Sequence, residues 1–281
     1  MPNYGYHFAR LDGGLRRKIY RSLLPTIVGR TVHQSGSIPL DVFSYSGEEA
    51  LPEQVRSIRS FLRHVGRPRS WTIVSDGSHS ERSIALLREI DSAVSIRPVD
   101  EDLPSDVPEK LRRYVTTYPM GKQLGLIMSL PRNGPALYLD ADILFFAGAV
   151  DIIQTLSLTK APALYLKDCL DYSVDRRILR DPSESSHPVN AGLLMLLRPL
   201  DWSLGTRRLL ELEGEPEFFT TQTIVQIVMQ ANGALPLDAA KYVLQLDDQF
   251  RYADFYAGSS IALRHYVNPV RHKFWIAAAS R

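Results

Sequence analysis

The stretch that decides the fold is Ala136–Phe146, which reads ALYLDADILFF. Apolar residues lead into Asp140-Ala141-Asp142, and a second apolar run follows at once. A short apolar run that comes directly after the turn residues Asn133-Gly134-Pro135 predicts a buried strand. An unpaired carboxylate in a dry interior is strongly unfavourable, so both aspartates must meet water, a cation or a basic partner.

The two aspartates have two interpretations. Residues two apart on a strand point to the same face, so Asp140 and Asp142 could bind one hard divalent cation. The alternative is a polar strand end whose carboxylates are solvated, which is the commoner outcome for an isolated Asp-x-Asp. The apolar residues on both sides of the motif favour the cation site.

The composition is that of an ordinary globular protein and bounds the function. The 281 residues can form one domain with a full core, and 44% of them are apolar and 23% charged. A net charge of +2 with scattered basic residues gives no indication of nucleic-acid binding. The single cysteine, Cys169, excludes an internal disulfide and fits a reducing compartment. No secretory signal or bilayer-spanning stretch is visible, so we expect a cytoplasmic protein.

Residues 1–37 are predicted to form a helical extension to the main domain. Leu15, Ile19, Leu23 and Leu24 fall on one helical stripe, with basic residues on the other faces. Such a helix can lie on an anionic surface, which would place the protein peripherally on the inner face of a membrane. The interpretation that we favour is a helix docked on its own domain, with its arginines in solvent.

From Ile38 onward, predicted strands and helices alternate. The strands are expected at 39–45, 71–75, 95–99, 136–139 and 163–166, and the intervening helices at 52–65, 81–90 and 120–130. This order predicts an α/β domain over 38–281, with a mostly parallel central sheet flanked by helices. Ligands of such sheets collect at the carboxyl ends of the strands, where Tyr45, Asp76 and the aspartate pair all fall.

Three later segments carry polar side chains that could serve a site. Asn190-Ala191-Gly192 offers an amide and a closely approaching backbone, although by itself it indicates a turn into the following apolar run. Gln222 falls in the first turn of a predicted helix. His265 is followed by cations that suit a pyrophosphate, whereas a lone histidine is more often structural.

Taken in order, four landmarks resemble the family 8 retaining glycosyltransferases, which have the metal-dependent GT-A fold. The landmarks are Tyr-Leu-Asp-Ala-Asp at Tyr138–Asp142, Asn-Ala-Gly at Asn190–Gly192, the glutamine segment at Gln222 and the tail His265–Trp275. The resemblance covers residues 38–281 and leaves the N-terminal extension unmatched. It implies an enzyme that moves a hexose from a UDP-sugar to an acceptor, which is a glycan, a protein or a small molecule.

By this resemblance, Asp140, Asp142 and His265 would hold Mn²⁺ on the diphosphate of the UDP-sugar, with Mg²⁺ as a second candidate. Two hard oxygen ligands and one imidazole suit Mn²⁺. The resemblance places Gln222 beneath the anomeric carbon, where it could stabilise an oxocarbenium-like state, since a neutral amide is a poor nucleophile. The remaining donor contacts that it implies are Phe43, Ser44 and Tyr45 for the uridine, Lys122, Ala141, Asn190, Ala191, Gly192 and Asn268, and Arg271 or Lys273 for the β-phosphate.

The chain departs from the family pattern in ways that keep alternatives open. Thr221-Gln222-Thr223 stands where the family usually has Asp-Gln-Asp, and Asn268 replaces a common glycine. One alternative is therefore a GT-A protein that binds a sugar nucleotide with weak turnover or none. Another is a haloacid-dehalogenase-type phosphatase, which normally has Thr or Val four residues after the first aspartate, where this chain has Leu144.

Overall fold

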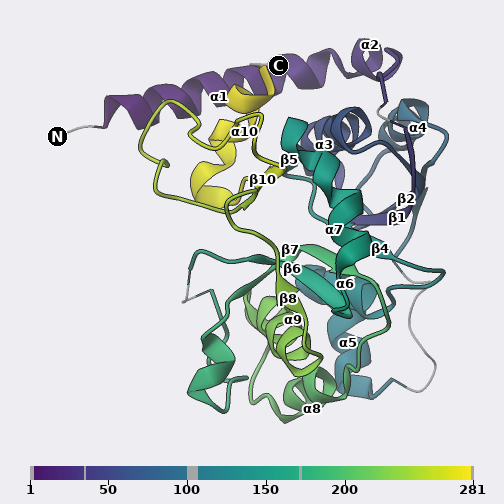
Figure 1. Cartoon of the computed structure of the whole chain (residues 1–281), viewed down its shortest axis with the longest axis vertical. Helices are drawn as coiled ribbons and strands as arrows, with labels where there is room; N and C mark the ends of the chain where they lie inside the picture. The colour runs from purple at the N-terminus through teal and green to yellow at the C-terminus, as the bar shows by residue number, and fades with distance from the viewer. Residues whose placement is uncertain (1–2, 35, 100–106, 171–172, 280–281) are drawn as a thin grey trace.

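The computed structural model describes residues 3–34, 36–99, 107–170 and 173–279 (Figure 1). Its larger sheet has seven strands in the order β3-β2-β1-β4-β7-β6-β8. The strands are β1 (Ser37–Ser46), β2 (Arg67–Ser75), β3 (Val94–Arg97), β4 (Ala136–Leu139), β6 (Ala163–Lys167), β7 (Val189–Leu196) and β8 (Leu235–Pro236). Only β7 runs antiparallel to its neighbours, β4 and β6. The predicted mostly parallel α/β sheet is confirmed.

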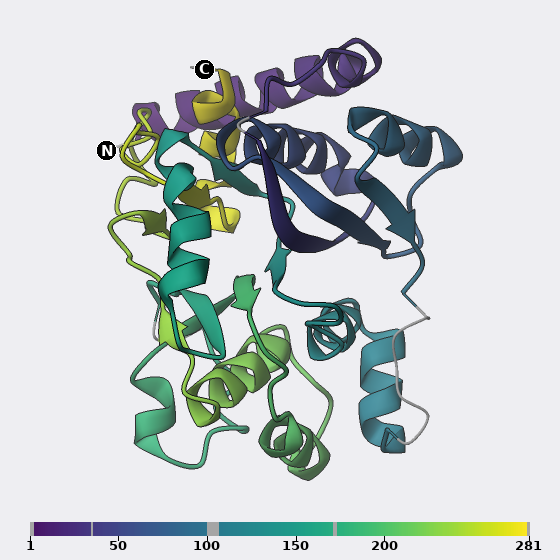
Figure 2. The same cartoon turned by 45° about the vertical axis from the view of Figure 1, so that its right-hand side comes forward.

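Helices cover both faces of this sheet, and the views agree on their arrangement (Figures 1 and 2). On one face lie α3 (Leu51–His64) and α4 (Glu81–Ile90). On the other lie α5 (Glu109–Thr117), α6 (Pro119–Met128), α8 (Ser203–Glu211) and α9 (Thr220–Ala231). A further helix, α7, spans Ile152–Leu158. Leu137 and Leu139 pack in the hydrophobic core on the α3 side of the sheet, whereas Ala136 and Tyr138 pack in the core on the α9 side. Because β4 is buried on both faces, its sequence is continuously apolar.

A smaller sheet of three strands, β5 (Ile143–Phe145), β10 (Leu263–His265) and β9 (Tyr242–Val243), stands beside the first. The turn Asp140-Ala141-Asp142 joins β4 of the larger sheet to β5 of the smaller one. In the antiparallel β5–β10 pair, His265 lies opposite Ile143, and the Tyr266 amide donates to the Asp142 carbonyl (3.0 Å). This register places a C-terminal histidine beside the aspartates.

The carboxyl ends of the neighbouring parallel strands β2, β1 and β4 meet at one edge, as predicted. Asp76 directly follows β2, and its amide donates to the Ser46 carbonyl at the end of β1 (3.0 Å). Tyr45 and Asp140 lie at the same edge. Polar residues from distant parts of the sequence therefore converge here.

Asn190-Ala191-Gly192 lies within strand β7, so its interpretation as a turn is wrong. Every residue of β7 is buried, and the strand has β4 on one side and β6 on the other. Pairing with two strands stabilises an extended backbone that the local sequence does not favour.

The N-terminal segment forms α1 (Tyr4–Ser22) and α2 (Leu24–Val28), and α1 packs on α10 (Arg271–Ala279) and α3. In both views α1 lies along an outer end of the molecule, next to α10 (Figures 1 and 2). The helix docks on its own domain, but through Ala9 and Gly13, which are buried. Of the predicted apolar stripe only Leu24 is buried, and the other members face solvent. The expected docking through that stripe is therefore wrong.

The contact between α1 and α10 depends on the absence of a side chain at Gly13. A Cβ at this position would overlap the backbone carbonyl of His272, whereas one at Gly14 would meet nothing within 4 Å. We expect Gly13→Ala to lower the free energy of unfolding by about 1–3 kcal/mol, because the two backbones must separate. The matched variant Gly14→Ala should raise it by up to about 1 kcal/mol through helix propensity. Chemical denaturation measures both, and equal effects would contradict this packing.

Candidate functional site

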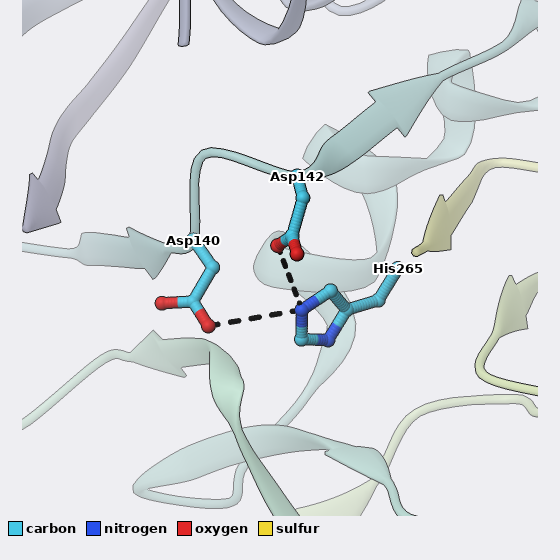
Figure 3. Close-up of side chains that lie close together, drawn as sticks. All are labelled: Asp140, Asp142 and His265. Carbon is cyan, nitrogen blue, oxygen red and sulfur yellow. Dashed lines mark hydrogen bonds and ion pairs between the residues drawn. The ribbon is translucent and has the colours of Figure 1, made fainter. Parts of the chain in front are cut away.

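Asp140, Asp142 and His265 form a compact cluster at the carboxyl end of β4 (Figure 3). One ligand atom from each residue lies within 4.8 Å of the other two. His265 Nε2 is 3.0 Å from Asp142 Oδ1 and 3.7 Å from Asp140 Oδ2, so the imidazole edge faces both carboxylates. A histidine more than a hundred residues further along the chain thus meets the two aspartates of one turn.

The orientation of His265 is fixed by Asn190. Its Nδ1 lies 2.9 Å from Asn190 Oδ1, an oxygen that can only accept, so Nδ1 carries a proton and donates it. Asn190 Oδ1 also accepts from the Gly192 amide (3.0 Å). The remaining nitrogen, Nε2, is therefore the atom presented to the carboxylates, as expected for a histidine ligand whose other nitrogen is held by hydrogen bonding.

Each carboxylate has further partners that position it. Asp140 Oδ1 accepts from the Tyr138 hydroxyl (2.9 Å) and from Gln123 Nε2 (3.2 Å). Asp142 Oδ2 accepts from Arg271, at 2.6 Å in its shorter contact. These bonds leave Asp140 Oδ2 and Asp142 Oδ1 directed towards His265.

Burial and charge set the protonation of the cluster. Burial raises the pKa of Asp140, and the attraction of His265 only partly offsets this. Burial also acts to raise the pKa of Asp142, but His265 and Arg271 outweigh it and lower that pKa to about 2. Burial acts to lower the pKa of His265, whereas the carboxylates of Asp142 and Asp140 outweigh it and raise that pKa. The two carboxylates are thus electrostatically coupled to an imidazole and an arginine.

The donor set fits a divalent cation. Two carboxylate oxygens and one imidazole nitrogen suit Mn²⁺, whereas Mg²⁺ and Ca²⁺ prefer oxygen ligands alone. Gly192 makes room for the cluster itself: a Cβ there would overlap the His265 ring and lie 2.8 Å from Asp140 Oδ2. The absence of a side chain at this point is what lets His265 approach the carboxylates.

We expect Gly192→Ala to displace His265 or Asp140 and to weaken Mn²⁺ binding by more than about tenfold, a range seen when ligand positioning is lost. Overpacking should also lower the free energy of unfolding by about 1–3 kcal/mol. Gly258→Ala is the matched control, since a Cβ there makes contacts of 3.8 Å. Calorimetric titration with Mn²⁺ compares the variants, and unchanged affinity in Gly192→Ala would contradict the crowding.

A second set of polar groups connects the cluster to Gln222, which lies in the first turn of α9 as predicted. Asp168 Oδ2 accepts from Asn190 Nδ2 (3.1 Å) and from Gln222 Nε2 (3.2 Å). Gln222 Nε2 also donates to the Ser173 carbonyl (2.9 Å). The structure therefore places Gln222 one side chain away from the residue that orients His265.

The two threonines beside Gln222 are fully buried and hydrogen-bonded. Thr221 Oγ1 donates to the Met120 carbonyl (2.6 Å) and lies 2.8 Å from the Tyr114 hydroxyl. Thr223 Oγ1 accepts from the Asp175 amide (2.7 Å) and donates to the Phe219 carbonyl (2.9 Å). Both side chains link α9 to neighbouring segments, so the departure from Asp-Gln-Asp is accommodated by packing.

The two cations considered for the β-phosphate occupy different environments. The Arg271 side chain is 52% exposed and contacts Asp142. Lys273 is completely buried, and its Nζ donates to the carbonyls of Arg251 (2.9 Å) and Ala253 (2.5 Å) and lies 3.4 Å from Asp248. The structure brings Arg271 to the cluster and does not bring Lys273 there. Asn268 is exposed at the start of the 3-10 helix η4 (Asn268–Val270).

The three residues predicted to contact the uridine, at the end of β1, differ in burial. Phe43 is part of the core, and the Ser44 hydroxyl is buried and accepts from the Trp71 indole (3.2 Å). The Tyr45 side chain is half-buried at the edge near Asp76, and burial, assisted by the charge of Asp76, raises the pKa of Tyr45 to about 12. Of these three residues, Tyr45 is the one whose side chain reaches the site edge.

The other predicted contacts are neighbours in sequence of residues that touch the cluster, and two further residues that touch it or Gln222 were not predicted. Lys122 is partly exposed on α6, Ala141 is buried in the turn between the aspartates, and Ala191 is buried in β7. Gln123, next to Lys122, is the residue of α6 that contacts Asp140; helical spacing gives no signal for it. Asp168 directly follows the apolar strand β6, the same signal that pointed to Asp140.

No family profile matches the chain, and no curated protein matches it in sequence. Several solved structures match its fold. A galactosyltransferase LgtC, solved with donor and acceptor sugar analogs, superposes with a TM-score of 0.56 at 16% identity, over 85% of this chain and 95% of LgtC. Mouse xyloside xylosyltransferase 1 gives 0.52 at 13% identity, over 83% and 99% of the two chains. The glycosyltransferase GlyE of Streptococcus pneumoniae TIGR4 gives 0.51 at 14%, over 86% and 60%.

These matches define the fold: the chain has the GT-A fold of glycosyltransferases, and the resemblance predicted from the sequence is confirmed at that level. These matches give no support to the phosphatase alternative. Leu144, which stands where such phosphatases normally have Thr or Val, is buried in β5. Within the described residues, no helix combines the length and apolar character needed to cross a bilayer.

Proposed function

We propose that this protein is a metal-dependent retaining glycosyltransferase that moves a hexose from a UDP-sugar to an acceptor. The observation that carries the proposal is the convergence of Asp140, Asp142 and His265 at the carboxyl end of β4. That edge is where ligands of parallel sheets bind. The GT-A fold supports the same conclusion, because the neighbouring structures are glycosyltransferases.

In this proposal the three residues hold Mn²⁺, which when bound neutralises charge on the departing UDP. Arg271 is the cation that we assign to the β-phosphate. Its half-exposed guanidinium already contacts the carboxylate of Asp142, so it can turn towards a second anion. Lys273 instead holds the chain near residues 251–253 in place. Tyr45 offers a ring on which the uracil can stack.

Gln222 acts on the donor sugar through its carbonyl oxygen. Because Nε2 donates to Asp168 and to the Ser173 carbonyl, the amide cannot rotate without breaking both bonds. The electron-rich Oε1 is then held in one direction, and its contact with Asn190 Nδ2 is long, at 3.5 Å. A fixed dipole of this kind stabilises positive charge that develops in an oxocarbenium-like state. Asn190, Ala191 and Gly192 form the adjacent backbone surface for the sugar.

A panel of UDP-sugars, incubated with the protein and Mn²⁺, tests the proposal through slow hydrolysis and UDP release. We expect one UDP-hexose to be hydrolysed faster than the others, with retention of anomeric configuration by NMR, and the activity to disappear with a chelator. Metal-dependent UDP binding without hydrolysis of any donor would favour the weakly active alternative that the residues beside Gln222 suggest. Absence of metal-dependent UDP binding would overturn both.

A further inference from the structure

The outer face of α1 carries an apolar stripe that the rest of the described chain leaves uncovered. Its members lie three or four residues apart, so they share one side of the helix. They are between 48% and 77% exposed. The stripe consists of Tyr4, Phe8, Leu11, Leu15, Ile19 and Leu23.

The stripe lies opposite the face through which α1 docks. The docking face contains the buried Ala9 and Gly13, together with Arg17, whose Nε donates to Glu53 (2.6 Å). Glu53 also accepts from the Trp275 indole (2.9 Å), which fixes α1 against α3 and α10. The helix is therefore held rigidly with its apolar side outward, whereas an ordinary surface helix turns that side inward.

Aromatic side chains from a distant segment extend the stripe at the N-terminal half of the helix. Tyr252 lies against the stripe residue Phe8, with ring centroids 5.3 Å apart, and is 36% exposed. Phe250, two residues before it, is 53% exposed and contacts Tyr6 on the docking side. Aromatic rings with a polar atom are favoured at the boundary between lipid and water.

The charges that flank the stripe are basic. Within α1 there are five basic side chains and one acid, Asp12, which is neutralised by Arg16 at 2.8 Å. Arg17 and Arg21 are paired with glutamates of the neighbouring 3-10 helix η1 (Glu48–Ala50) and of α3. Lys18, three positions after the stripe residue Leu15, is exposed, and no acidic partner is found for it among the described residues. Arg10 lies on the docking side of the helix, over the Tyr6 ring. The free charge beside the stripe is thus positive.

We propose that this face of α1 docks on an anionic lipid bilayer. An exposed apolar stripe with aromatic residues and flanking cations is the composition of helices that lie in the interface plane. A second copy of the chain fits less well. A coiled-coil seam through Leu11 and Leu15 would continue at positions 18 and 22, which are Lys18 and Ser22. Two copies would also oppose their free cations.

The proposal is independent of the donor sugar and is tested with the full chain and defined vesicles. We expect co-sedimentation with vesicles of equal parts phosphatidylcholine and phosphatidylglycerol, weaker binding to phosphatidylcholine alone, and release by salt. Leu11→Ser, Leu15→Ser and Ile19→Ser combined should lower the partition coefficient by more than about tenfold, because three apolar side chains no longer leave water. Lys18→Gln should lower it about fivefold on the anionic vesicles only.

The matched control is Val150→Ser, Ile153→Ser and Leu158→Ser combined, since these apolar residues are similarly exposed but lie outside α1. This control should bind vesicles like the unaltered chain. Thermal unfolding should show all variants folded, because the altered side chains are exposed. No vesicle binding by the unaltered chain, or equal loss in the control, would overturn the proposal. A dimer in light scattering that the α1 variant converts to a monomer would assign the face to a second copy instead.

Discussion

Asp142→Asn is expected to abolish Mn²⁺-dependent binding of UDP while the protein stays folded. The asparagine oxygen keeps the shape of the side chain and can still accept from Arg271, but the anionic ligand is gone. Without this charge, the main cause that raises the pKa of His265 disappears. Hard divalent cations prefer anionic oxygen, so we expect affinity for UDP with Mn²⁺ to fall by more than about a hundredfold. Calorimetric titration with UDP, with and without Mn²⁺, measures the effect.

Asp41→Asn provides the control for this loss. Asp41 is also a buried carboxylate with arginine and serine partners, Arg69 and Ser70, and its pKa is likewise lowered, chiefly by its hydrogen bond to Arg69. It lies beside the start of β4, whereas Asp142 follows the end of that strand. Both variants should lose about 1–3 kcal/mol of stability. Undiminished metal-dependent binding in Asp142→Asn, or an equal loss in Asp41→Asn, would refute the assigned role.

Much of the fold follows from local sequence signals. The apolar run before Asp140 fixes β4, because a strand buried on both faces admits few polar residues. The helix predicted at 81–90 has these bounds in the structure, since Ser80 accepts from the Ser83 amide as its N-cap. Strand ends that carry Tyr45, Asp76 and Asp140 meet at one edge because their strands are parallel neighbours.

Other features depend on contacts that no local pattern encodes. Strand β10 has three residues, too few to show a periodicity, and its pairing with β5 is what brings His265 to Asp142. The position of His265 was predicted only through the order of landmarks shared with a family. Asn190-Ala191-Gly192 resembles a turn until β6 is paired with Asn190 and the Asp140 amide donates to the Gly192 carbonyl.

The orientation of α1 shows why an apolar pattern can be right about a helix and wrong about its docking. Hydrophobic spacing predicted that Leu15 and Ile19 share a face, and they do. It could not show that the opposite face, with Ala9 and Gly13, approaches α10 more closely than any large side chain would permit. Small residues give no signal in a hydrophobic pattern, although they decide how near two helices come.

Gln222→Ala is expected to lower kcat for donor hydrolysis by about a hundredfold or more, with little change in KM. The substitution removes Oε1, which this structure holds in one direction through Asp168 and Ser173. An oriented dipole that interacts with charge formed only in the transition state affects kcat and leaves ground-state binding unchanged. Steady-state hydrolysis of the UDP-sugar selected by the panel separates the two constants.

Gln226→Ala distinguishes this effect from a general disturbance of α9. Gln226 lies one turn further along the same helix and is buried, with Oε1 accepting from the Val189 amide (3.1 Å) and Nε2 donating to the Glu184 carbonyl (2.6 Å). Its loss leaves buried groups unpaired and should lower stability by about 1–3 kcal/mol, with kcat nearly unchanged. If Gln222→Ala instead raised KM as much as it lowered kcat/KM, Gln222 would serve binding alone. If both variants lost kcat equally, the effect would belong to the helix and not to the amide.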